Sequence, residues 1–298
     1  MNFRDERYSK SLTGLSSSEL EILSVSFELK YTEYLKSKNL NSKRKFGGGR
    51  KGVFPATRDK ICFCLYYLKN YPTFDTIAYH FGISRSTAHE AIHKMIPVML
   101  ETLKLHDVLP IEHFESVESM ETYFEKKKVT EIIIDATERE YYRPENSVEQ
   151  SALYSGKQGY HTMKNSIFCD KNKYIHFLGY TTQGSIHDLE LIRIEFNTKY
   201  DWFANLNCMV DLGYLGFNND YKTKTTIIPI KKPNNQELTS EQKLYNQKIS
   251  SERVVVENSI CGIKRFSILV HRYRNKIFYF EDLIIRVAAG IWNFHIST

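Results

Sequence analysis

The sequence has no apolar run approaching the roughly 18 residues of a membrane-spanning helix. It is also poor in proline and glycine, with 7 and 14 among its 298 residues. These shortages exclude a chain that crosses a membrane as a helix and a collagen-like or low-complexity chain. Residues 1–10 are charged and lack the apolar segment of a secretory signal. With 42 % hydrophobic residues, the chain is expected to fold as a soluble protein inside the cell.

Cysteine is scarce and irregularly placed. The closest pair, Cys62 and Cys64, has one residue between its members, whereas zinc sites usually have two to four. An odd number of distant thiols also excludes a disulfide framework. We therefore expect reduced and mostly buried thiols at all five positions: Cys62, Cys64, Cys169, Cys208 and Cys261.

Charge is present but unevenly spread. Residues 41–60 carry seven basic side chains and one acid, residues 101–125 seven acids and one lysine, and residues 253–286 seven basic side chains and three acids. Two basic stretches separated by an acidic one suggest two surfaces that meet polyanions, with ordinary solvated charge as the alternative. The first stretch is glycine-rich and lacks apolar periodicity, which predicts a flexible arm along DNA phosphates. Its contact residues would be Lys43, Arg44, Lys45, Arg50 and Lys51.

Residues 74–92 have the layout of a helix-turn-helix. Ala78 is small where two helices must cross closely, and Gly82 lies four residues later, where the turn needs a positive φ. Ile83 and Ile92 would pack the second helix onto the first. The start of the second helix normally enters the major groove of DNA. The predicted contacts there are Ser84, Arg85, Ser86 and His89.

His89 and His93 stand four residues apart within the same segment. At helical spacing they could ligate a metal ion. A pair that faces solvent or DNA has the same spacing and is the favoured interpretation.

The character of the chain changes at Val129. The β-branched segment 129–135 predicts a buried strand, and segments 161–169 and 174–181 predict a hairpin. Further elements are expected as strands at 206–210 and 225–230 and helices at 187–197, 247–266 and 280–295. This order indicates an α/β domain. The predicted organisation is a helical segment with the basic arm (1–52), a helix-turn-helix domain (53–105), an acidic linker (106–128) and a catalytic domain (129–298).

Three carboxylates occupy special positions in that domain. Asp135 and Asp211 each close a strand, and Glu257 lies inside a helix. Sites in α/β sheets form at the carboxyl edge of the strands. If the three acids converge, each pair at about 4 Å costs about 4 kcal/mol at an effective dielectric of about 20. A cation would relieve this repulsion, and all-oxygen ligands favour Mg²⁺ or Mn²⁺. Taken singly, each acid could instead be a cap or a surface residue.

The surroundings of Glu257 favour a functional role. Arg253 lies four residues before it and Lys264 seven after it, so the three share one helix face. That arrangement suits a metal site pressed against a phosphate backbone, although an ion-pair ladder would look similar. Asp188 competes for a catalytic role, but it stands early in a predicted helix, where an acid also favours the helix dipole. We assign it a structural or outer position.

Several segments occur together in a distinctive order. They are residues 71–74 followed by the helix-turn-helix, 135–138, 154–157 with His161, Thr162 and Lys164, 184–189, 211–216, 229–233, and 253–257 with Gly262 and residues 264–266. With these segments the chain resembles bacterial insertion-sequence transposases of the Harbinger-like Asp-Asp-Glu type, from about Phe46 to the C-terminus. The final motif of that family reads Tyr, two residues, Arg, three residues, Glu, six residues, Lys. Ser250 stands at the tyrosine position here.

The resemblance implies an α/β fold of the ribonuclease-H-like type, with a mixed sheet, preceded by an all-α helix-turn-helix domain. It implies that Asp135, Asp211 and Glu257 are the catalytic acids and the ligands of Mg²⁺, with Mn²⁺ as a substitute. Double-stranded DNA would be the partner, and a dimer or higher oligomer in the bacterial cytoplasm would join two DNA ends. Phosphate contacts are expected from Lys157, His161, Lys164, Arg253, Lys264 and Arg265.

The expected activity is that of a DNA transposase. It would bind the terminal inverted repeats of its own element, hydrolyse a phosphodiester at each end and join the freed 3′-hydroxyls to target DNA. Two alternatives remain open: a DNA-binding regulator with an inactive nuclease-like domain, and a stand-alone metal-dependent nuclease.

Overall fold

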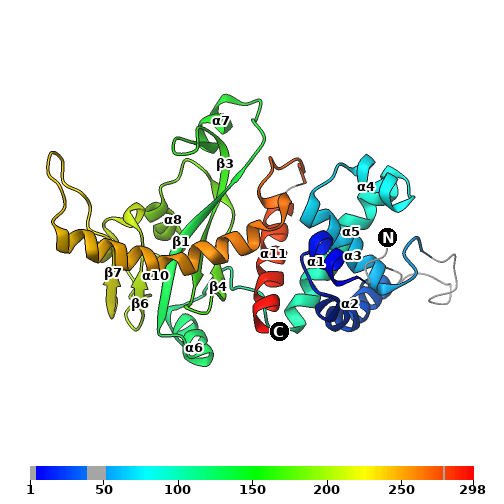
Figure 1. The fold of residues 1–298 in the computed structure, drawn as a ribbon, viewed down its shortest axis with the longest axis horizontal. Helices are drawn as coiled ribbons and strands as arrows, with labels where there is room; N and C mark the ends of the chain where they lie inside the picture. Colours follow the sequence, from blue (N-terminus) through cyan, green and yellow to red (C-terminus); the bar gives the residue numbers. More distant parts are fainter. Residues whose placement is uncertain (1–4, 39–51, 278) are drawn as a thin grey trace. The chain divides into compact units, whose positions relative to one another are not determined.

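The computed structural model describes residues 5–38, 52–277 and 279–298, and the chain divides into two compact units (Figure 1). Unit 1 contains residues up to 109 together with 263–271 and 275–298, and unit 2 contains residues 110–262 and 272–274. The predicted catalytic domain at 129–298 includes residues 263–271 and 275–298, which this division places in unit 1. The final helix packs in unit 1, a tertiary contact that no sequence pattern reveals.

Unit 1 is helical. Its helices are α1 (Glu6–Thr13), α2 (Ser17–Lys38), α3 (Thr57–Asn70), α4 (Phe74–Phe81), α5 (Arg85–Leu105) and α11 (Phe280–Ser297), with the 3-10 turn η2 (Ser267–Leu269). Ser16 and Glu19 form a reciprocal cap at the start of α2, in which each side chain accepts from the other residue's backbone N–H. Helix α11 packs closely on α5: a Cβ at Gly290 would lie 3.1 Å from Cδ1 of Leu103. A small residue is therefore required there.

The helix-turn-helix forms as predicted, from α4 and α5. Gly82 adopts a φ of +64° and closes the turn, and Ile83 N–H donates to the Ala78 carbonyl at 3.0 Å. Helix α5 continues past Pro97 to Leu105, although a proline usually ends a helix at the residue before it. Proline removes one backbone donor, but the residues around it are buried. Burial of that helix face therefore outweighs the lost hydrogen bond.

Unit 2 is built on a mixed sheet. Its strands are β1 (Glu131–Glu140), β2 (Tyr154–Ser155), β3 (Tyr160–Cys169), β4 (Ile175–Leu178), β5 (Thr182–Gln183), β6 (Asn207–Met209) and β7 (Thr225–Ile227). The order is β2-β3-β1-β6-β7, with β4 and β5 also paired to β3. Strand β1 is antiparallel to β3 and parallel to β6, which is parallel to β7. The predicted hairpin of β3 and β4 is present.

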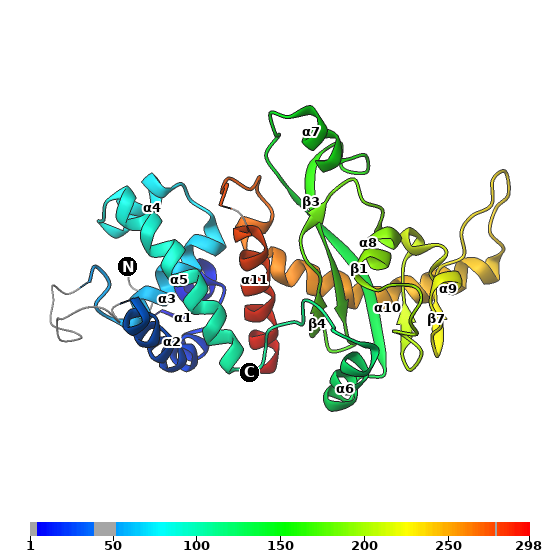
Figure 2. The same ribbon diagram turned by 180° about the vertical axis from the view of Figure 1, so that it is seen from behind.

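Helices cover both faces of this sheet. The helices of unit 2 are α6 (Val117–Lys127), α7 (Ser147–Leu153), α8 (Asp188–Glu195), α9 (Phe217–Asp220) and α10 (Ser240–Lys264), with the 3-10 turn η1 (Leu212–Tyr214). Alternate side chains of β1 point to opposite faces. Ile132 and Ile134 join a core with α6 and α8, whereas Ile133 packs with Met209 of β6 and Val256 of α10. Figure 2 shows the same strands from behind, with α8 nearer the viewer.

The predicted fold class is confirmed: a mixed-sheet α/β domain follows an all-α region with a helix-turn-helix. The five cysteines are free thiols, four of them buried, as expected. Among the described helices, none is both long enough and apolar enough to cross a membrane.

Candidate active site

The central strands β1 and β6 bring two of the predicted acids together. Ile133 pairs with Met209 across the parallel ladder, and both side chains face α10. Asp135 comes two residues later on β1, so the period of two turns its side chain toward the same helix. Asp211 follows two residues after Met209, just beyond the end of β6, and its carboxylate also faces α10. Asp211 also begins η1, where its Oδ1 accepts from Gly213 N–H at 2.7 Å.

Arg253 of α10 lies between these two carboxylates. Its Nη2 is 3.1 Å from Oδ2 of Asp135 and 3.8 Å from Oδ2 of Asp211. The arginine side chain is only 15 % exposed. The sequence predicts that Arg253 holds phosphate, but here its guanidinium bonds to the acids instead, because α10 lies directly over them.

Burial dominates the electrostatics of Asp135. The pKa of Asp135 is raised to about 6, chiefly by desolvation. The neighbouring charges of Asp211 and Asp188 act in the same direction, while Arg253 and the Ala136 N–H oppose the shift. One arginine therefore offsets the crowding of the acids only in part.

A second ion pair lies on the α8 side of the site. Lys164 Nζ is 2.8 Å from Oδ1 of Asp188 and 3.4 Å from Oε1 of Glu138, and it also donates to the Ile186 carbonyl at 2.8 Å. Lys164 is buried. Its predicted contact with DNA phosphate does not fit this position, since two carboxylates and a carbonyl already surround the ammonium group.

Glu257 does not join the other two acids. It is exposed on α10, one helical turn after Arg253 and on the same side of the helix. Within the described ranges, no three His, Cys, Asp or Glu side chains form a group that could hold a metal ion. The expected convergence of all three acids is therefore not observed.

The remaining residues still fit a divalent cation. Asp135 and Asp211 both direct an oxygen at one positively charged nitrogen of Arg253. Together with Glu138 and Asp188 they make four carboxylates, against the two cations Arg253 and Lys164. Carboxylate oxygens are the ligands that Mg²⁺ and Mn²⁺ prefer. The two aspartates as ligands and this excess of two negative charges suit such an ion, and no third acid of the described residues joins the pair as a ligand.

The recognition end of α5 carries the predicted DNA contacts. Arg85, Ser86 and His89 are exposed there. Ser84 has a structural task as well, because its Oγ accepts from Thr87 N–H at 3.1 Å and caps the helix.

The two histidines of α5 do not form a metal site. Nδ1 of His93 is 2.8 Å from the His89 carbonyl oxygen, and its Nε2 is 3.0 Å from Nδ2 of Asn275. A ring that donates from Nδ1 and accepts at Nε2 satisfies both bonds. Both ring nitrogens are thus engaged.

The other predicted DNA contacts divide into three groups. Lys157 is exposed on the segment between β2 and β3, and His161 is half-buried near the start of β3. Lys264 ends α10, and Arg265 lies over the rings of Phe266 and Trp292, at 5.4 and 5.8 Å from their centroids. That stacking accounts for Arg265 without DNA. The basic arm residues Lys43, Arg44, Lys45, Arg50 and Lys51 lie outside the described residues.

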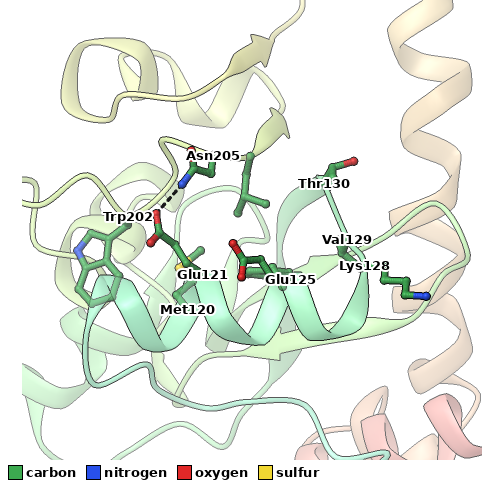
Figure 3. A pocket seen from close by; sticks show the side chains of 10 residues that line it. Met120, Glu121, Glu125, Lys128, Val129, Thr130, Trp202 and Asn205 are labelled. Carbon is green, nitrogen blue, oxygen red and sulfur yellow. Dashed lines mark hydrogen bonds between the residues drawn. The ribbon is translucent and has the colours of Figure 1, made fainter.

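A pocket of about 400 Å³ lies elsewhere in unit 2 (Figure 3). Its lining includes Val129 and Thr130, which precede β1, and Leu206, which precedes β6. These residues mark the amino ends of the strands, whereas Asp135 and Asp211 lie beyond them along the chain. The pocket is therefore not part of the acidic site.

Two buried groups near the acids have no distinctive sequence pattern. Glu195 of α8 accepts from Ser166 Oγ at 2.5 Å, and burial raises its pKa to about 8. Tyr214 is fully buried in η1, and burial beside Asp135, Asp188 and Asp211 raises its pKa well above the ordinary value. The short spacing from Asp211 to Tyr214 is a weak signal for the second. No sequence signal marks Glu195.

Comparisons with known proteins show the family of this chain. The family model described as DDE superfamily endonuclease matches residues 134–293, and the model for the helix-turn-helix of DDE superfamily endonuclease matches residues 56–105. A protein of Microchaete diplosiphon, described as the probable transposase for insertion sequence element IS702, is 30 % identical over 241 residues, covering 80 % of each chain. No solved structure matches.

Proposed function

The chain belongs to the DDE superfamily of endonucleases, and on that premise we propose that it is the transposase of an insertion sequence. Its helix-turn-helix binds the terminal inverted repeats of the element, and the acidic site cleaves the ends and joins their 3′-hydroxyls to target DNA. The observation that carries this proposal is the meeting of Asp135 and Asp211 at Arg253, in a chain that also has a DNA-reading motif.

Asp135 and Asp211 would hold a Mg²⁺ ion. Glu257 is exposed on α10 and does not join them in this structure, so its side chain would have to move toward the two aspartates to complete the coordination. When bound, such a cation activates the attacking oxygen and stabilises the leaving oxygen of the phosphodiester. Arg253 keeps the two aspartates together while their charges repel. Buried Lys164 holds Asp188 and Glu138 on the other side of the site.

The start of α5 supplies the reading surface. Arg85 and His89 are exposed there, and a helix N-terminus of this kind enters the major groove in many DNA-binding proteins. The basic arm at residues 43–51 would add phosphate contacts whose strength falls steeply with salt. Because two ends must be joined, at least two copies of the chain would assemble on DNA in the bacterial cytoplasm.

The test is a strand-transfer reaction with Mg²⁺, using DNA that carries the repeats flanking the gene and a supercoiled target. Joined products support the transposase. Nicks alone would indicate a nuclease, and binding without cutting would indicate a regulator. Either of the last two results contradicts the proposal.

Matched variants locate the activity. We expect Asp135→Asn, Asp211→Asn and Glu257→Gln to abolish joining but to bind the DNA ends as the wild type does. Asp201→Asn removes an exposed acid ahead of β6 and should join normally. Normal joining by Glu257→Gln would remove Glu257 from the proposed site and leave the two aspartates.

A further inference from the structure

Asp188 is the first residue of α8, and a buried cation holds its carboxylate in place. Oδ1 of Asp188 is 2.8 Å from Nζ of Lys164, and Lys164 is itself anchored by the Ile186 carbonyl and Glu138. The carboxylate is therefore held from one side by Lys164, whose ammonium group is fixed by these two further contacts.

The other oxygen of Asp188 faces the turn that carries Asp211. A Cβ built on Gly213 would lie 2.8 Å from Oδ2 of Asp188 and 2.9 Å from Oδ1 of Asp211. The Gly213 N–H also donates to that same Asp211 oxygen. Gly213 has no positive φ, so glycine is needed here for space rather than for backbone conformation. Two carboxylates thus flank a single glycine.

We propose that Asp188 is a positioning residue of the acidic site, which acts through Gly213 to fix the orientation of the Asp211 carboxylate. This inference rests on the proposed function. Oδ2 of Asp188 and Oδ1 of Asp211 both lie beside Gly213. With Asp188 held by Lys164 and Oδ1 of Asp211 held by the Gly213 N–H, the other oxygen of Asp211 faces Arg253, which also contacts Asp135. The two strand acids are then arranged for a shared cation before the cation binds.

If Asp188 only stabilised helix α8, another acid in the same turn would be equally important. Asp188 and Glu190 both stand in the first turn of α8, where either acid favours the helix dipole. Glu190 pairs instead with Arg193, and both side chains of that pair are exposed. Glu190→Gln is therefore the matched control, because it removes the same charge from the same turn without touching Gly213.

The experiment measures Mn²⁺ binding to the full chain without DNA. The protein is titrated with Mn²⁺, and the electron paramagnetic resonance signal of free Mn²⁺ gives the unbound fraction. We expect Asp188→Asn to raise the dissociation constant for Mn²⁺ at least tenfold and Glu190→Gln to change it less than twofold. Both variants should bind end DNA as the wild type does. Unchanged Mn²⁺ binding by Asp188→Asn would overturn the inference.

A double variant covers the case in which Asp188→Asn fails to fold because Lys164 loses its partner. Lys164→Met combined with Asp188→Asn removes both charges, so the net charge of the site is unchanged. If Asp188 positions Asp211, the double variant folds and still binds Mn²⁺ at least tenfold more weakly. Wild-type binding by the double variant would show that Asp188 only neutralises Lys164, and would overturn the inference.

The outcome separates this inference from the proposed function. A wild-type chain that binds Mn²⁺ but joins no DNA refutes the transposase, while the comparison of Asp188→Asn with Glu190→Gln still decides the role of Asp188. A wild-type chain that joins DNA, together with an Asp188→Asn variant that binds Mn²⁺ equally well, refutes only the role of Asp188. A wild-type chain that binds no Mn²⁺ removes the premise of the inference and overturns it.

Discussion

Arg253 and Asp135 are 118 residues apart in the chain, yet Nη2 of the arginine lies 3.1 Å from Oδ2 of the aspartate. The same nitrogen is 3.8 Å from Oδ2 of Asp211. A helix that follows the sheet thus supplies the positive charge that two strand-borne acids need. The arrangement allows both acids to be ionised beside each other before any cation binds.

The burial of Asp135 predicts a gain in stability when its charge is removed. Its pKa of about 6 exceeds the ordinary value, so the ionised form costs folding free energy at any pH above 6. In EDTA at pH 7.5, Asp135→Asn should therefore unfold at a higher temperature than the wild type, by a few degrees. Thermal denaturation followed by circular dichroism measures this. A clearly lower unfolding temperature would mean that the bond to Arg253 outweighs burial.

Glu195 predicts a pH-dependent difference in stability. Burial raises its pKa to about 8, so the folded protein favours the protonated acid. The stability it contributes is present below about pH 4.5 and is lost as the pH rises toward 8. Glu195→Gln cannot ionise and should match the wild type at pH 4.5. It should become more stable by on the order of 4 kcal/mol at pH 9.

Urea denaturation of both proteins at pH 4.5, 7 and 9 tests the role of Glu195. Ser166→Ala serves as a control because it removes the hydroxyl that donates to Glu195. That hydrogen bond lowers the pKa of Glu195, so without it the pH at which Glu195 ionises in the folded protein should be higher. A difference between wild type and Glu195→Gln that stays constant from pH 4.5 to 9 contradicts the prediction.

The exposed start of α5 predicts a change in DNA affinity without a change in stability. Arg85 is 73 % exposed and lies 3.9 Å from an equally open Asp75, a surface pair that contributes little to folding. Arg85→Ala should weaken binding to end DNA about tenfold, in line with the 1–3 kcal/mol of a good base contact. Fluorescence anisotropy measures the affinity. Lys104→Ala, at the other end of the same helix, is the control and should bind normally.

Two lysines on neighbouring segments predict opposite phenotypes. Lys157 is exposed, so Lys157→Gln should weaken DNA binding and lower the salt dependence by about one counterion. Lys164 is buried among carboxylates, and Lys164→Gln should cost about 3–5 kcal/mol of stability, as when one partner of a buried pair is removed. Salt titrations and thermal unfolding of both variants check this. If Lys164→Gln folds normally and loses as much DNA affinity as Lys157→Gln, Lys164 contacts DNA and the prediction is wrong.

Local sequence signals predicted most of the secondary structure and the helix-turn-helix. Gly82 has the positive φ that the spacing from Ala78 requires, and the apolar segment around Ile133 forms the central strand. These features depend on neighbours within a few residues. Asp211 follows the end of β6, close to its predicted position. The prediction that Asp135 closes its strand was wrong, because pairing with β3 extends β1 to Glu140. The continuation of α5 past Pro97 was not predictable in this way, because distant buried contacts stabilise it.

By itself, the sequence determined the order of helices and strands and the helix-turn-helix, since each follows from short-range periodicity or turn chemistry. Only the tertiary structure decided which charged side chains pair with one another. It turned Arg253 toward Asp135, enclosed Lys164 between Glu138 and Asp188, and left Glu257 exposed on its helix. Charge pairing depends on distance in space and on burial, and neither is encoded in the spacing of residues along the chain.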